Sequence, residues 1–124
     1  MTMKKLFCSV FFAVGFFVAA HAQFTVQGTN TTGGTWDILA KDGNNNLVAL
    51  PSVGANFSGT NPASSAFSVK VGLTNTNNGC VVSGLISGIG SGTLTGTGSC
   101  AIYSVSYSAT QLSPGNIVVT LGIN

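Results

Sequence analysis

Apolar and polar residues alternate along most of the chain after residue 23, and no stretch follows a helical period. The clearest case is the segment 66–74, in which Phe67, Val69, Val71 and Leu73 define one face. The same alternation predicts strands over 24–27, 35–41, 47–50, 101–109 and 117–123. Turn signals separate these segments, among them Asp42-Gly43 and Pro114-Gly115. The pattern therefore predicts a β protein built from short strands.

The central segment Cys80–Cys100 is rich in Gly, Ser and Thr, carries no charge, and has a Cys at each end. We interpret it as two strands joined by a Gly turn and stapled by a Cys80–Cys100 disulfide. The segment 51–66 contains two prolines and is expected to be irregular, with Phe57 either anchoring it or lying in a short edge strand.

Together these segments give about eight short strands, which is typical of an antiparallel sandwich. The expected fold is an all-β, Ig-like β-sandwich with one disulfide, running from about Phe24 to Ile123. Alternation predicts the residues that face its interior. They are Trp36, Ile38, Phe67, Val69, Val71, Leu73, Val105, Val119 and Leu121.

The first 22 residues have the three parts of a secretory signal peptide. Lys4 and Lys5 form a positive start, an apolar run extends over Leu6–Ala20, and Ala20-His21-Ala22 is a small-residue cleavage site. The alternative, an uncleaved membrane anchor, is disfavoured because the run is shorter than the roughly 20 residues that span a bilayer. We therefore expect a signal peptide over 1–22, a single domain over 23–124, and export through the periplasm.

Cleavage changes the charge balance of the protein. Two of the four basic residues leave with the signal, so Lys41 and Lys70 remain to balance Asp37 and Asp42. With no basic patch to neutralise phosphates, nucleic acid is not an expected partner. Two of the three Cys remain, an even number that suits a disulfide in an oxidising compartment.

Candidate catalytic chemistry is sparse. The only His, His21, leaves with the signal, and Asp37 and Asp42 are the only acidic residues. General acid–base catalysis needs such groups in position, so we expect no enzyme activity and no cofactor. The run Asp42-Gly-Asn44-Asn-Asn46 matches the opening of a calcium loop but lacks its later Gly and Glu. A hairpin turn explains this run better than a metal site does.

The aromatic residues offer a second possible site, because Trp and Tyr rings can stack on sugars. Trp36, Tyr103 and Tyr107 each lie on the apolar face of an alternating segment, so core packing is the favoured interpretation. A soluble carbohydrate-binding module is retained as an alternative. Its signature would be an exposed aromatic cluster, for example Trp36 near the turn 44–46.

Several motifs together resemble a known family. Cys80-Val-Val-Ser-Gly-Leu-Ile, then Gly-Ser-Gly-Thr-Leu-Thr-Gly leading into Cys100, and a closing Ile-Val-Val-Thr follow an uncharged Thr-rich and Ser-rich chain. From about Val69 onward the chain resembles the small exported bacterial proteins called protein activators of alkane oxidation. That resemblance implies a place at the cell surface or in a biofilm matrix. The overall profile is also similar to chaperone–usher pilins, including the spore-coat-U type. Neither resemblance implies a catalytic residue.

The expected function is a secreted structural or adhesive subunit that self-associates at the cell surface or in a matrix. Near-zero charge removes long-range repulsion between copies. The terminal strands 24–27 and 117–123 are short amphipathic segments that could add to the sheet edge of a neighbour. The alternative is a monomer that pairs both of these strands within its own sheet.

Overall fold

The computed structural model of the protein describes residues 22–124. The expected signal peptide, 1–22, lies outside this part except for Ala22. Nine strands and one short 3-10 helix make up the described residues, which confirms the all-β prediction. The elements are β1 (Phe24–Asn30), β2 (Trp36–Lys41), β3 (Leu47–Val53), β4 (Asn56–Asn61), β5 (Val69–Asn75), β6 (Val81–Ile86), β7 (Gly90–Thr95), η1 (Gly98–Ile102), β8 (Ser104–Ser113) and β9 (Asn116–Ile123).

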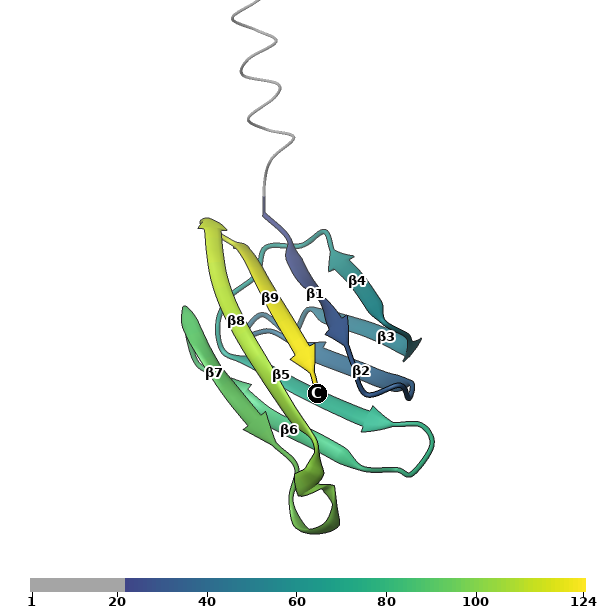
Figure 1. Cartoon of the computed structure of the whole chain (residues 1–124). Helices are drawn as coiled ribbons and strands as arrows, with labels where there is room; N and C mark the ends of the chain where they lie inside the picture. The colour runs from purple at the N-terminus through teal and green to yellow at the C-terminus, as the bar shows by residue number, and fades with distance from the viewer. Residues whose placement is uncertain (1–21) are drawn as a thin grey trace, which may run out of the picture.

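The strands form two sheets that face each other as the layers of a sandwich (Figure 1). The five-stranded sheet has the order β4-β1-β9-β8-β7, and the four-stranded sheet has the order β3-β2-β5-β6. All neighbouring pairs are antiparallel except β1 and β9, which run parallel from the Phe24–Ile117 pair to the Asn30–Ile123 pair. The first and last strands of the domain therefore lie side by side inside one sheet.

The core lies between the sheets and follows the predicted alternation. Of the nine residues predicted to face inward, only Phe67 is not fully buried; it is half-buried and packs against the edge of the core. It lies outside β5, which begins at Val69 rather than at the predicted Ala66. Further core residues come from β1, β2, β3, β4, β6 and β9. They include Phe24, Val26, Ala40, Val48, Val53, Phe57, Val82, Ile86, Ile117 and Ile123.

The strand predictions in the first half of the chain were incomplete. The segment expected over 24–27 continues as β1 to Asn30. The segment expected over 47–50 continues as β3 to Val53 and includes Pro51. This strand is at the edge of its sheet, where a missing backbone N–H is tolerated. The next segment forms β4 instead of an irregular loop, and it buries Phe57, which confirms the edge-strand alternative for that residue.

At the two sides of the sandwich, an edge strand of one sheet meets an edge strand of the other, and a leucine packs against a glycine. A side chain at Gly59 of β4 would collide with Leu50 of β3. A side chain at Gly84 of β6 would collide with Leu94 of β7 in the same way. On each side a leucine therefore packs directly against a glycine backbone, and the open space between the layers is filled.

The disulfide between Cys80 and Cys100 is confirmed, with a Cα–Cα distance of 5.4 Å. It encloses β6 and β7, the two strands expected in this segment, but these strands do not pair with each other. β6 pairs with β5 in one sheet, and β7 pairs with β8 in the other. Cys100 lies in η1, so β8 begins at Ser104 rather than at Ala101. The disulfide thus ties together one edge of each sheet.

Candidate interaction surfaces

The two aspartates are not brought together. Asp37 is exposed near the start of β2, and one of its carboxylate oxygens accepts a hydrogen bond of 2.8 Å from the Ser52 N–H. Asp42 follows the end of the same strand and is buried. Five residues of extended strand separate them by roughly 16 Å. Paired carboxylates in glycoside hydrolases are about 5 to 10 Å apart, so this arrangement does not form such a pair.

Asp42 holds its turn together. Its Oδ1 accepts hydrogen bonds from the backbone N–H groups of Asn44 (2.9 Å) and Asn46 (2.7 Å), and its Oδ2 accepts one from the Asn46 amide (3.0 Å). Burial raises the pKa of this carboxyl. The nearby Ser65 hydroxyl and the donors from Asn46 and Asn44 lower the pKa by more than burial raises it, so it lies below its ordinary value. The run that resembles a calcium loop is an Asx-type turn with a bonded carboxylate.

Trp36 is fully buried, which confirms the interpretation that it packs in the core. Its indole N–H donates to the Thr32 hydroxyl at 3.0 Å, and its ring is perpendicular to that of Tyr103 at a centroid distance of 4.9 Å. The Tyr103 hydroxyl accepts a hydrogen bond from the Asn78 amide. Among residues 22–124 every Phe, Tyr and Trp is buried or half-buried. The exposed aromatic cluster expected of a sugar-binding platform is therefore not found in the described residues.

The outward face of the five-stranded sheet carries no charge. Most of its exposed positions are occupied by Ser, Thr, Asn and Gln, which the strand register sets in rows. Leu112, near the end of β8, is also exposed. Some of the hydroxyls bond across strands, as Thr25 does to Thr60 at 3.1 Å. A neighbour could therefore cover this face without desolvating an ion, whose burial is much more costly than that of a hydroxyl.

The outward face of the four-stranded sheet is different. It is the more apolar face, with Leu39, Leu47, Val81 and Leu85 respectively 53%, 47%, 50% and 53% exposed. It also carries Asp37, Lys41 and Lys70, whereas the five-stranded sheet has no charged residue. The signal for this surface was present in the sequence. Alternation over 35–41 places Leu39 on the outward face, between Asp37 and Lys41.

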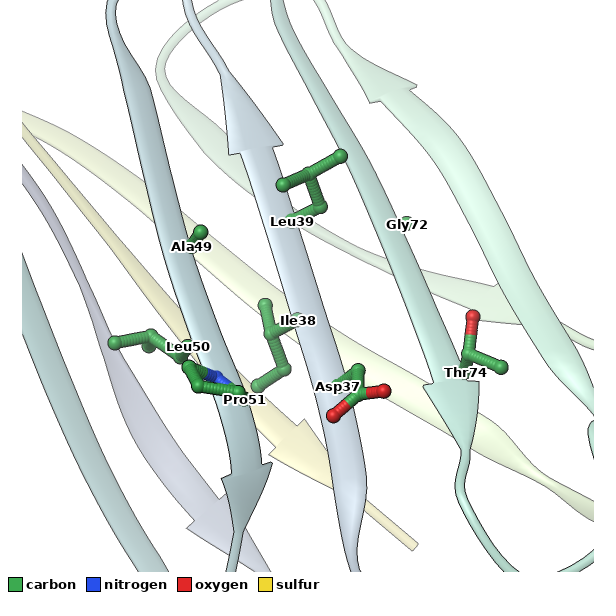
Figure 2. A pocket seen from close by; sticks show the side chains of 8 residues that line it. All are labelled: Asp37, Ile38, Leu39, Ala49, Leu50, Pro51, Gly72 and Thr74. Atoms are coloured by element: carbon green, nitrogen blue, oxygen red, sulfur yellow. The ribbon is translucent and has the colours of Figure 1, made fainter.

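A shallow hollow lies in the middle of this face (Figure 2). It has a volume of about 400 Å³ and is lined by Leu39 of β2, Ala49 and Pro51 of β3, and Gly72 and Thr74 of β5. The space over Gly72 is part of the hollow, because a Cβ atom added there would meet no atom within 4 Å.

The sheet edges carry no charged side chains. The four edge strands have the sequences Asn-Phe-Ser-Gly-Thr-Asn in β4, Gly-Ser-Gly-Thr-Leu-Thr in β7, Leu-Val-Ala-Leu-Pro-Ser-Val in β3 and Val-Val-Ser-Gly-Leu-Ile in β6. Natural sheets commonly protect their edges with Lys or other charges. Only β3 has another of the usual protections, since it contains Pro51 and a register irregularity.

The terminal strands are not at these edges. β1 is hydrogen-bonded to β4 on one side and β9 on the other, and β9 is hydrogen-bonded to β1 and β8. This is the arrangement of the alternative in which both strands pair within their own sheet. In this fold neither strand is free to add to a neighbour.

Comparison of the chain with protein-family models, with curated proteins and with solved structures found no match. Between residues 22 and 124 no helix is long and apolar enough to cross a membrane. The same residues contain no group of three or more His, Cys, Asp or Glu side chains that could hold a metal ion.

Proposed function

We propose that this protein is an exported structural or adhesive subunit that self-associates at the cell surface or in an extracellular matrix. The single observation that carries the proposal is the absence of charge from all four edge strands of the sandwich. An uncharged edge presents unpaired N–H and C=O groups to another chain. A strand or a sheet edge of a second copy can satisfy these groups by strand addition.

Two further features support the proposal. The signal-like segment 1–22 and the Cys80–Cys100 disulfide both suit an exported protein, because disulfides persist in oxidising compartments. Pairing of β1 and β9 within the sheet limits how assembly occurs. Copies join through the strand edges, which include β4 and β7 of the five-stranded sheet, or they exchange a terminal strand.

The test places Lys on the outer strands of the five-stranded sheet. Ser58 of β4 and Thr93 of β7 are both exposed, and the double variant Ser58→Lys/Thr93→Lys adds a charge to each edge. The matched control is Ser108→Lys, another exposed hydroxyl position, on the interior strand β8. Electron microscopy and light scattering of the exported protein would follow assembly.

We expect the wild type and Ser108→Lys to assemble alike and the edge variant to assemble at least about tenfold less, because edge charges oppose strand addition. If the wild type forms no assemblies at any concentration, the proposal of a self-associating subunit fails. If the edge variant assembles as well as the control, the proposed role of the β4 and β7 edges fails.

A further inference from the structure

The outward face of the four-stranded sheet has an unfavourable charge arrangement of its own. Lys41 of β2 and Lys70 of β5 are direct cross-strand partners. Like charges in this relation destabilise a sheet. Asp42 lines the same depression as both lysines, but its carboxylate is bonded within its own turn. The two ammonium groups therefore offer a site for a carboxylate from another molecule.

The same face carries a carboxylate at its other end. Asp37 precedes Lys41 by four residues on β2, so the two side chains lie on one face about 13 Å apart along the strand. Leu39 stands midway between them, and Gly72 is its cross-strand partner on β5. Figure 2 shows the Leu39 side chain projecting toward β5 beside the bare Gly72.

This pattern is complementary to itself. A twofold axis that crosses the strands at Leu39 and Gly72 exchanges the two ends of the face. The axis brings Asp37 of each copy opposite the Lys41–Lys70 pair of the other copy. The same contact therefore forms at both ends of the face, as an isologous interface requires. The two Leu39 side chains and the two hollows over Gly72 then meet at the centre, where leucine can fill space that the isolated chain leaves open.

We propose that the outward face of the β3-β2-β5-β6 sheet binds the same face of a second copy of this chain through this twofold axis. The inference deepens the proposed self-association and rests on it for its partner. Four strands about 4.8 Å apart and about six residues long give a contact of roughly 400 Å² on each copy. An interface of this size is in the weak, transient class. Such a weak interface contributes to assembly when other contacts, such as those between strand edges, already hold two copies close together and so raise the effective concentration of one face near the other.

The experiment uses charge reversal in two separate variants of the exported protein. Asp37→Lys sets an ammonium group opposite Lys41 of the other copy in a homodimer. Lys41→Asp sets a second carboxylate opposite Asp37 of the other copy in a homodimer. Analytical ultracentrifugation up to millimolar concentration would measure dimerisation of each variant alone and of an equimolar mixture. Ser108→Lys, on the opposite sheet, is the control for an added charge.

The wild type and Ser108→Lys are expected to dimerise with the same dissociation constant. Each reversed variant alone is expected to bind at least about tenfold more weakly, because like charges then face each other. The mixture is expected to recover the wild-type constant, since it again sets a carboxylate opposite an ammonium group at both ends of the face. A monomeric wild type, a reversed variant that dimerises normally, or a mixture that fails to recover would each overturn the proposal.

A further variant tests the interface without changing Asp37, whose carboxylate also accepts a hydrogen bond from the Ser52 N–H. Gly72→Gln adds a neutral side chain whose Cβ would meet no atom within 4 Å, so we expect the fold to tolerate it while the side chain fills the hollow. We expect it to abolish dimerisation, whereas Ser108→Gln on the other sheet leaves it unchanged. Normal dimerisation of folded Gly72→Gln would overturn the proposal.

The edge variant Ser58→Lys/Thr93→Lys keeps this face intact, so failure of edge assembly and failure of the dimer are separate results.

Discussion

Asp42 is a charged residue on which the turn between β2 and β3 depends. It is only 4% exposed, and its carboxylate accepts three hydrogen bonds that fix the turn between β2 and β3. Its pKa lies below the ordinary value because these donors favour the charged form more than burial disfavours it. An ordinary aspartate in a turn would be replaceable. This one links local turn geometry to the pairing of two strands.

The pH dependence of stability should therefore follow Asp42. A carboxyl whose pKa is lowered on folding contributes stability above the pKa of the unfolded chain, about 3.9, and loses that contribution as the pH falls through the folded value. We expect the free energy of unfolding to decline below about pH 4. Asp42→Asn should cost about 1 to 3 kcal/mol at pH 7, and less at low pH.

Urea unfolding at several pH values measures both effects. The control is Asp37→Asn, which changes an exposed carboxylate with one backbone partner and should retain the acid-induced decline. An equal decline in wild type and Asp42→Asn would show that another group controls the acid response.

Strand prediction succeeded where one face of an element is buried and the other is open. β5 and β9 alternate in this way, and the sequence was enough to place both. β4 has a single large apolar residue, Phe57, so its sequence carries no periodic signal, and its strand structure depends on pairing with β1. The assignment of β6 and β7 to opposite sheets is likewise set by long-range pairing, which no local pattern specifies. The Leu39 face could have been predicted, since an apolar residue at an outward position is visible in the alternation.

The disulfide is the link between these two edge strands. Its loop spans 20 residues, and closing such a loop stabilises a fold by about 3 kcal/mol in the chain-entropy model. We expect the double variant Cys80→Ser/Cys100→Ser to lose about this much in urea unfolding. Amide hydrogen exchange should rise first in β6 and β7, because each of these strands is paired on one side only.

Reduction of the wild type is the matched control and should give the same loss. A uniform rise in exchange across both sheets would instead mean that the disulfide stabilises the whole sandwich and not these edges.

At the scale of the whole molecule, the first and last strands of the described residues, β1 and β9, pair with each other within one sheet. β1 cannot be held on both sides until β9, the last strand, is in place, because β9 is its parallel partner. Pairing over so long a stretch of sequence is expected to slow folding. It also leaves the nascent chain with a missing strand in the centre of a sheet. A second copy could supply that strand, and such exchange is a route to assembly that needs no free edge.

This architecture predicts the effect of removing the first strand. Deleting residues 23–28 removes Phe24 and Val26, both fully buried, and leaves β4 without its partner in the sheet. Losing the two side chains alone costs about 5 kcal/mol, against a total stability of about 5 to 15 kcal/mol for a domain. We therefore expect the truncated chain to lose cooperative unfolding by circular dichroism, rather than to remain folded and merely fail to assemble.

A synthetic peptide of residues 23–30 should restore the fold when added in trans, because it supplies the missing strand and both buried side chains. The same peptide with Val26→Lys is the control and should not restore it, since it would place an unpaired charge between the sheets. A truncated chain that unfolds cooperatively without peptide would show that β1 is dispensable, and assembly by exchange of this strand would then lose its physical basis.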